Sequence, residues 1–384
     1  MFEFSEVHQM IRETVSKLAK DVFAPKASEL DEKEQFGKEN FAKLAELGLL
    51  GITIPEEYGG AGSDVISATI ALEEMGAIDP GTALSYGAHS ILCANNINEN
   101  ANEFLKKKYL PDLASGKKIG GMAITEPGAG SDALGIKTTA RKDGNYYILN
   151  GSKTFITNGP VGDTFVVYAK TAPDMGKNGI SIFIVEKDFP GFAVGKKLHK
   201  MGMRASPTSE LYFEDCKVPA ENLIGEENRG LIGMMRNLDT ERVTLSGISL
   251  GITRASLEIS LEYSQERKQF GKQIAEFQII QDKLSEIATA YQTSWYLVYG
   301  AAQKILEGKR ANMEAAMAKV FAAESATKSA LSAIQILGGY GYTKDFPVER
   351  LARDAKLMEI GAGTSEIQRM VIFKELIRRK QIFS

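Results

Sequence analysis

The sequence has few of the residues that build metal clusters, disulfide frameworks or membrane spans. Its 384 residues include two cysteines, Cys93 and Cys216, and three scattered histidines, His8, His89 and His199. This set predicts neither a disulfide framework nor a metal centre. No apolar run approaches the roughly 18 residues that a membrane-spanning helix needs. Because the opening Met-Phe-Glu-Phe-Ser-Glu is too acidic for a signal or transit peptide, we expect a soluble, cytoplasmic protein with reduced thiols.

The chain also lacks an excess of charge of either sign. It has 46 Lys and Arg against 49 Asp and Glu, a formal net charge of −3. This balance gives no reason to expect nucleic acid or an anionic membrane as a partner. A hydrophobic content of 43% and a charged content of 25% are typical of globular proteins. The length indicates two or three domains, because single cores stop growing near ~250–300 residues.

Hydrophobic periodicity divides the chain into three zones, each expected to be a domain. Residues 1–118 have the spacing of amphipathic helices. Residues 119–229 contain short runs rich in β-branched and aromatic residues, with a hairpin expected over Thr138–Leu149. Residues 230–384 are expected to be entirely helical, which makes the fold class α+β. The long helices expected in this last zone lie near 231–265, 276–308, 311–338 and 346–379.

A glycine-rich segment, Gly121 to Asp132, stands at the entrance to the β zone. Gly128 and Gly130 would let backbone N–H groups approach a ligand, while Thr125 and Ser131 offer hydroxyls. The G-x-G-x-x-G spacing of a dinucleotide fingerprint is absent. An ordinary turn would explain the composition alone, so the case for a ligand depends on the family resemblance given below.

Three further segments carry candidate binding residues. In a strand over Asn150–Gly159, alternation places Phe155 and Thr157 on one face, where a ring and a hydroxyl could meet a planar cofactor. Arg267 lies at a bend between two long helices. An arginine there is usually a solvated loop charge, but its fork of donors also suits a pyrophosphate. The segment Gln335–Tyr342 reads as a helix end stopped by glycines.

Residues 359–368, Glu-Ile-Gly-Ala-Gly-Thr-Ser-Glu-Ile-Gln, resemble the C-terminal flavin-contact motif of the acyl-CoA dehydrogenases. With the segments above, the resemblance covers essentially the whole chain and is strongest to the isovaleryl-CoA dehydrogenases. It implies an N-terminal helical domain, a central β-barrel-like domain and a C-terminal four-helix bundle. It also implies a homotetramer with one FAD per subunit, completed by a neighbouring subunit. Further segments that support it are Leu84–Ser90, Lys200–Arg204, Phe213–Cys216 and Asp239–Val243.

The resemblance also assigns binding roles residue by residue. Five residues would line the flavin ring: Met122, Ile124, Thr125, Phe155 and Thr157. Phe155 stands where many members have Trp, which should keep the stacking face but lose the indole donor. Five others would reach the FAD of a partner subunit: Arg267, Phe270, Gln278, Gln335 and Gly339. Thr364 and Glu366 would contact the FAD near its diphosphate and adenosine. Three would follow the CoA: Ser131, Asp239 and Arg242.

One position departs from the family pattern and bears on catalysis. Most members have a glutamate just before the Gly-Thr pair of the last motif, and it removes the α-proton of the substrate. Here Ala362 stands in its place, with Gly361 before it. The backbone N–H of Ala362 remains available to polarise the thioester carbonyl with a cofactor hydroxyl. We expect Glu241 to be the base, since isovaleryl-type enzymes carry theirs at the matching place. A helix-surface role for Glu241, and Glu359 as the base, are the alternatives.

The resemblance implies conversion of an acyl-CoA to the trans-2-enoyl-CoA, with electrons passed to an electron-transfer flavoprotein in fatty-acid or amino-acid catabolism. Small residues at Gly361 and Ala362 suit a short branched acyl group such as isovaleryl. A cyclic or a straight short- or medium-chain acyl group stays open, because one methylene is worth only ~1–3 kcal/mol of discrimination. An acyl-CoA oxidase and a non-catalytic interaction protein of the same fold are disfavoured, since no extra C-terminal domain is present and the motifs are intact.

Overall fold

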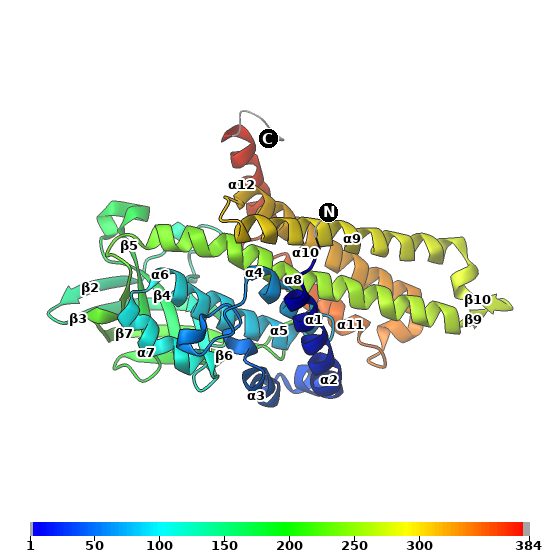
Figure 1. The fold of residues 1–384 in the computed structure, drawn as a ribbon, viewed down its shortest axis with the longest axis horizontal. Coiled ribbons are helices and arrows are strands. Elements are labelled where there is room, and N and C mark those ends of the chain that lie inside the picture. The colour runs from blue at the N-terminus through cyan, green and yellow to red at the C-terminus, as the bar shows by residue number, and fades with distance from the viewer. Residues whose placement is uncertain (1–2, 379–384) are drawn as a thin grey trace.

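The structure, a computed structural model, describes residues 3–378 of an elongated molecule (Figure 1). The β-sheet lies at one end of the long axis, and a short hairpin of β9 (Lys268–Gln269) and β10 (Lys272–Gln273) lies at the other. Long helices run between the two ends. The expected α+β layout of a helical, a sheet and a second helical part is confirmed. The domain boundaries near 118 and 229 stay predictions, and residues 1–2 and 379–384 lie outside the described residues.

The N-terminal helices begin at polar caps. The Ser5 side chain accepts a bond from the His8 N–H at the start of α1, and Asp64 does the same for α4 through the Ser67 N–H. His8 in turn lies 3.0 Å from Asp64, which joins the two helix starts. The helices are α1 (Glu6–Leu18), α2 (Ala24–Lys33), α3 (Lys38–Glu46), α4 (Val65–Gly76), α5 (Pro80–Gly87), α6 (Asn96–Asn100) and α7 (Glu103–Ala114).

The central sheet has eight strands in the order β6-β7-β3-β2-β4-β5-β8, with β1 parallel to β4. The expected hairpin is confirmed, because β2 and β3 pair from Thr139 opposite Asn150 to Asp143 opposite Tyr146. The strands are β1 (Gly120–Ala123), β2 (Thr139–Asp143), β3 (Tyr146–Thr157), β4 (Thr164–Lys170), β5 (Ile180–Glu186), β6 (Phe192–Lys197), β7 (Thr208–Pro219) and β8 (Leu223–Ile224).

The C-terminal part is built on α8, an unbroken helix of 37 residues. The single helix expected near 346–379 is wrong, because a turn over residues 359–364 divides it into α11 and α12, and α12 projects from the body (Figure 1). Residue 379 lies outside the described residues. The elements are α8 (Gly230–Glu266), β9 (Lys268–Gln269), β10 (Lys272–Gln273), α9 (Gln278–Leu306), α10 (Asn312–Leu337), α11 (Val348–Met358) and α12 (Ser365–Arg378).

Glycines let α8 pack against α4 with close backbones. A Cβ on Gly251 would lie 2.3 Å from the Glu73 carbonyl oxygen, and one on Gly247 would lie 2.5 Å from that of Thr69. No side chain fits at such distances. The contact fixes α8 against the N-terminal helices. It thereby sets the position of each α8 side chain, along the helix axis, relative to those helices.

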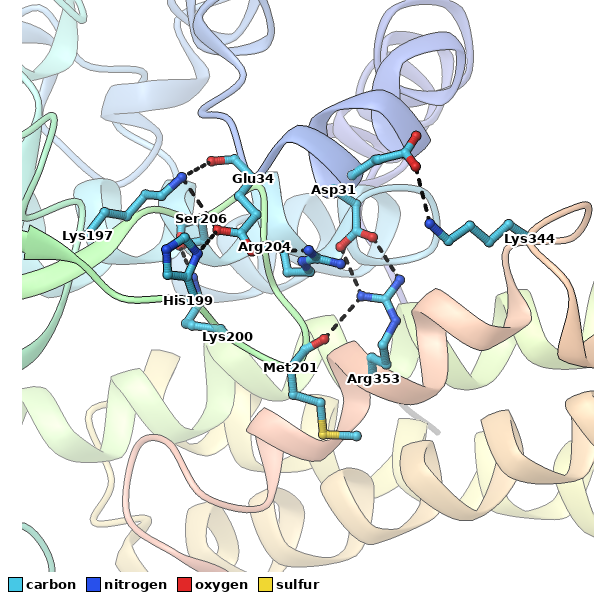
Figure 2. A network of polar contacts seen from close by, with 11 residues as sticks. Asp31, Glu34, Lys197, His199, Lys200, Met201, Arg204, Ser206, Lys344 and Arg353 are labelled. Atoms are coloured by element: carbon cyan, nitrogen blue, oxygen red, sulfur yellow. Dashed lines mark hydrogen bonds and ion pairs between the residues drawn. The ribbon is translucent and has the colours of Figure 1, made fainter.

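A polar network joins the N-terminal helices, the loop before β7 and α11 (Figure 2). Arg353 of α11 pairs with Asp31 of α2 at 2.7 Å and donates to the Met201 carbonyl at 3.2 Å. Glu34, which follows α2, pairs with Arg204 at 3.1 Å and with His199 at 2.7 Å. Segments from three parts of the chain are thereby held in one arrangement. Separately, no helix of the described range combines the length and apolar character needed to cross a membrane.

Candidate active site

The candidate flavin-side residues lie at the end of β1 and on β3. Met122 is the centre of a small polar contact: its Sδ lies 3.7 Å from Asn96 Nδ2 and 3.9 Å from Asn237 Nδ2. Met122 and Ile124 pack together with the apolar cluster between the sheet and α7. Thr125 is half-buried at the end of this segment. Asn237 belongs to α8, so the β1 end and α8 are in direct contact here.

The aromatic ring of Phe155 is exposed to solvent at a β-bulge in β3. Its side chain is 69% exposed, and its φ of +57° lies in the left-handed region that a phenylalanine rarely adopts. The β3–β7 register shifts between Lys153 and Ile156, so the strand bulges at this position. Thr157 is half-buried two residues further along. An exposed aromatic ring on a strained backbone is typical of a ligand contact, and it fits the face of a planar ring system.

A buried ion pair beneath this surface was not predicted from the sequence. Lys153 of β3 is fully buried, and its Nζ donates to Glu126 Oε1 at 2.8 Å and to the Ile124 carbonyl at 2.9 Å. Glu126 also accepts bonds from the N–H groups of Lys137 and Thr138. Burial lowers the pKa of Lys153 to about 8, although Glu126 opposes that shift. The pair joins the glycine-rich segment to the strand that carries Phe155.

Glu241 lies one helical turn after Asn237, on the face of α8 that meets the β1 end. It is 5% exposed, and within the described range its Oε2 has no hydrogen-bond partner. Burial raises the pKa of Glu241 to about 7, against the lowering effects of Arg242 and Lys319. A buried carboxyl with a free oxygen and a pKa near neutrality can accept a proton from a bound molecule.

The turn over residues 359–364 presents a second unusual group. Ala362 has a φ of +54° and Gly363 a φ of +84°. Their carbonyls are held by Gln368 Nε2 at 2.9 and 3.0 Å, and Lys319 Nζ donates to the Gly363 carbonyl at 2.7 Å. Among the residues described, none accepts a hydrogen bond from the Ala362 N–H. The turn thus holds one backbone donor ready for an external acceptor.

The rival carboxylate, Glu359, is in a different environment. Its Oε2 lies 2.7 Å from Lys356 Nζ, and its pKa is lowered by hydrogen bonds to Lys356 and Thr327 although partial burial opposes this. A carboxylate that is held in an ion pair is a weaker proton acceptor than one raised toward neutrality. The geometry therefore favours Glu241 over Glu359.

The remaining local candidates lie in three places. Arg242 Nη1 donates to Asp239 Oδ1 at 2.9 Å, so this arginine pairs one turn back along α8 and not with its neighbour Glu241. At the start of α12, Thr364 Oγ1 accepts from the Ile367 N–H at 3.3 Å, and Glu366 is exposed. Ser131 is exposed in the glycine-rich loop.

Five predicted residues belong to the segment that contains β9 and β10, to the start of α9 and to the end of α10 with the turn after it. The β9–β10 hairpin lies at the opposite end of the molecule from the sheet (Figure 1). Arg267 is separated from Glu241 by 26 positions, roughly 40 Å along the helix. Arg267 and Gly339 line a cavity of about 510 Å³. Phe270 is 93% exposed with a φ of +52°, and Gln278 and Gln335 are exposed. One chain does not bring these residues to the Glu241 side.

Comparisons with known proteins match this arrangement along the whole chain. The profile "Acyl-CoA dehydrogenase, N-terminal domain" matches residues 5–117, "Acyl-CoA dehydrogenase, middle domain" matches 121–216, and "Acyl-CoA dehydrogenase, C-terminal domain" matches 228–377. The chain belongs to the acyl-CoA dehydrogenase family. It is therefore an oxidoreductase, and the sequence-based family assignment is confirmed.

Relatives of this acyl-CoA dehydrogenase differ in the substrate that their names state. Mitochondrial isovaleryl-CoA dehydrogenase of Pongo abelii is 47% identical over 96% of this chain and 88% of its own length. A short-chain specific acyl-CoA dehydrogenase of Clostridium acetobutylicum is 44% identical over 98% of this chain and 100% of its own. The family is thus clear, while the two names point to different acyl groups.

Solved structures agree closely with the fold. Butyryl-CoA dehydrogenase from Megasphaera elsdenii superposes with a TM-score of 0.96 at 42% identity, covering 98% of this chain and 100% of its own. A chain solved in work on the electron transferring flavoprotein of Acidaminococcus fermentans gives 0.97 at 44% identity, with coverages of 99% and 100%. An FAD complex of PigA gives 0.94 at 32% identity, with coverages of 98% and 99%.

The buried state of Glu241 predicts a pH-dependent difference in stability between this acyl-CoA dehydrogenase and its Glu241→Gln variant. The folded-state pKa of Glu241, about 7, lies above the ordinary 4.5. The stability that the raised pKa contributes is fully present below pH 4.5 and is lost as the pH rises through 7. The glutamine does not titrate, so the variant does not lose this stabilisation. Its free energy of unfolding relative to that of the wild type should therefore increase by about 3 kcal/mol between pH 4.5 and 8. Urea unfolding at fixed protein and FAD concentration measures the difference, and a constant difference would contradict a raised pKa.

Proposed function

We propose that this enzyme performs FAD-dependent α,β-dehydrogenation of a short branched acyl-CoA, isovaleryl-CoA or a close analogue, to the trans-2-enoyl-CoA. The observation that carries the proposal is the buried Glu241, which has a carboxyl oxygen without a hydrogen-bond partner among the described residues. It lies one helical turn after Asn237, the residue that contacts Met122 at the β1 end. Ala362 occupies the place where most family members have their glutamate, so the base must come from another element. Glu241 is a carboxyl with the burial and the raised pKa that this role needs.

In this proposal two groups of the chain act on the thioester. The Glu241 carboxylate accepts the α-proton, and the Ala362 N–H donates to the carbonyl oxygen, where negative charge develops. Bound FAD supplies the acceptor for the β-hydrogen, which leaves as a hydride. The exposed Phe155 ring would hold the planar part of FAD, and Met122, Ile124, Thr125 and Thr157 would border it. Burial of Glu241 shields its carboxyl from water during the transfer.

Support for a branched acyl group comes from the turn and from one relative. Gly361 and Ala362 carry little side-chain volume, and a relative named isovaleryl-CoA dehydrogenase covers nearly all of the chain. Another relative is named short-chain specific, so a straight short-chain acyl-CoA is the second candidate. We place the CoA along Ser131, Asp239 and Arg242, and the FAD diphosphate and adenosine near Thr364 and Glu366.

We further infer a homotetramer in which each FAD lies between two subunits. The supporting observation is the separation of about 40 Å along α8 between Glu241 and Arg267, which is more than one FAD molecule extends. Arg267, Phe270, Gln278, Gln335 and Gly339 would then serve the cofactor of a partner subunit. A cytoplasmic location and an electron-transfer flavoprotein as the acceptor complete the proposal.

Arg267→Ala is expected to lower FAD retention at least tenfold, because a bidentate donor to the diphosphate is lost. The flavin absorbance per subunit after gel filtration measures the effect. Arg229→Ala is the matched control: Arg229 precedes α8 as Arg267 follows it, and among the described residues its guanidinium pairs only with Glu226, at 3.9 Å. Equal FAD content in both variants would contradict a cofactor role for Arg267.

Anaerobic titration of the purified holoenzyme tests the proposed function. Isovaleryl-CoA is added first, followed by butyryl-CoA, a medium straight-chain acyl-CoA and a cyclic acyl-CoA. Bleaching of the flavin band by isovaleryl-CoA at the lowest concentration is the expected result. Stronger bleaching by butyryl-CoA would establish the second candidate, and no bleaching by any of them would overturn the proposal.

A further inference from the structure

Lys319 of α10 is a buried lysine with one described hydrogen bond. Its side chain is 3% exposed, and its Nζ donates to the Gly363 carbonyl at 2.7 Å. An ammonium group carries three donors, and burying one is costly unless it is paired. A purely structural position would be filled more cheaply by an apolar residue of similar length. The groups around Lys319 should therefore show what a positive charge does at this position.

The charges that face Lys319 come from three elements. Glu241 and Arg242 approach it from α8, Glu359 from the end of α11, and Glu366 from α12. Burial raises the pKa of Glu241, while Arg242 and Lys319 act to lower it. Burial also raises the pKa of the Tyr168 phenol on β4, and Glu241 adds to that effect. Arg242 is already bonded to Asp239, and Glu359 to Lys356. Two cations therefore act on Glu241, and they differ in their partners. Arg242 is bonded to a carboxylate, whereas Lys319 is bonded to none among the described residues.

We propose that Lys319 is a positioning residue that couples the base to the carbonyl-binding turn. Its hydrogen bond to the Gly363 carbonyl fixes the turn, and so directs the adjacent Ala362 N–H. Its positive charge favours the ionised form of Glu241 before proton transfer. Both effects come from one ammonium group, which lies between α8 and the turn. The inference rests on the proposed function for its catalytic consequence, while the contact with Gly363 stands independently of the substrate.

Two substitutions separate the two effects. In Lys319→Met the charge and the donor are both lost. In Lys319→Gln the charge is lost, while the amide can still donate to the Gly363 carbonyl. Without the charge, the pKa of Glu241 rises further, because an opposite charge nearby favours the ionised form. At neutral pH a smaller fraction of Glu241 is then ready to accept the α-proton. Lys319→Arg keeps a cation and serves as the conservative variant.

The rate of flavin reduction as a function of pH is the first readout, measured by anaerobic stopped flow. In Lys319→Met and Lys319→Gln the acid limb should move to higher pH by about one unit, the low end of the effect of a nearby opposite charge. The rate lost at pH 7 should return as the pH is raised. Lys319→Arg should keep the wild-type midpoint. An unmoved acid limb in both neutral variants would overturn the electrostatic half of the proposal.

Hydrogen exchange in the peptide over residues 359–368 is the second readout, and it needs no turnover. Exchange should be at least tenfold faster in Lys319→Met than in wild type, and intermediate in Lys319→Gln. Lys200→Met is the matched control, because Lys200 is also partly buried and donates to one carbonyl, that of Ser206, at 2.7 Å (Figure 2). It should leave both readouts at wild-type values, and equal effects of Lys200→Met and Lys319→Met would overturn the proposal.

The two readouts also separate this inference from the proposed function. If no acyl-CoA reduces the wild-type flavin, the proposed function fails, while the exchange data still decide whether Lys319 orders the turn. If the wild type is reduced and the neutral variants match it in rate, pH profile and exchange, the role of Lys319 fails alone. Should Lys319→Met not fold, the Lys319→Gln and Lys319→Arg pair gives the same comparison.

Discussion

Glu241→Gln is expected to lower the rate of flavin reduction by acyl-CoA about 10²–10⁴-fold or more, the range that a general base contributes. The amide keeps the size of the side chain but cannot accept a proton. Binding of FAD and acyl-CoA should persist, because neither depends on the charge of Glu241 in the proposed geometry. Anaerobic stopped flow gives the reduction rate, and a ligand titration of the same variant gives the affinity.

Glu359→Gln is the matched control for this experiment. It makes the same chemical change in the rival carboxylate, which is paired with Lys356 near the surface. A partly exposed pair of this kind contributes little to stability, so the variant should fold and reduce its flavin at nearly the wild-type rate. Rapid reduction in Glu241→Gln, or a collapse of the rate in Glu359→Gln, would reverse the assignment of the base.

Lys153→Met is expected to destabilise the protein by about 3–5 kcal/mol, because it leaves Glu126 as a buried charge without its ionic partner. The pair is almost fully buried, with a distance of 2.8 Å between Lys153 Nζ and Glu126 Oε1. FAD retention should fall as well, since Lys153 also holds the Ile124 carbonyl beside the proposed flavin face. Denaturant unfolding and the flavin content per subunit measure the two effects.

Two further variants show whether the unpaired charge is the cause. Lys153→Met combined with Glu126→Gln removes both charges and keeps an acceptor for the Lys137 and Thr138 N–H groups, so it should recover most of the stability. Lys33→Met breaks an exposed pair with Glu29 and should cost less than about 1 kcal/mol. A double variant as unstable as the single one would mean that packing, and not charge, explains the loss.

Local patterns in the sequence were sufficient for the order of the three parts of the fold. The expectation that residues 230–384 are entirely helical is wrong, because the short strands β9 and β10 pair between α8 and α9. The hairpin at Asp143 and Tyr146 follows from a turn signal between alternating runs, and the bend at Arg267 from a break between long helical periods. The division between α11 and α12 was missed. Helical periodicity continues on both sides of Gly361 and Gly363, and these glycines were interpreted only as a ligand motif.

The candidate site could be predicted only in part. Glu241 was found because the family pattern has a gap at Ala362, which directs attention to another carboxylate. Lys153 and Lys319 gave no such signal, because a lysine in a sequence indicates solvent unless its partner is known. The partner of Lys153 is 27 positions away, and that of Lys319 is a backbone carbonyl 44 positions away. The left-handed backbone at Phe155 was equally hidden, since glycine is the usual indicator of that conformation.

The unbroken length of α8 has a consequence for how such a chain can change over evolution. Inserting one residue between Glu241 and Arg267 would turn one end of the helix by about 100° relative to the other and lengthen it by about 1.5 Å. The glycine contacts with α4 would then be displaced from their partners. Insertions and deletions should therefore accumulate in the surface loops, while the number of residues in α8 stays constant.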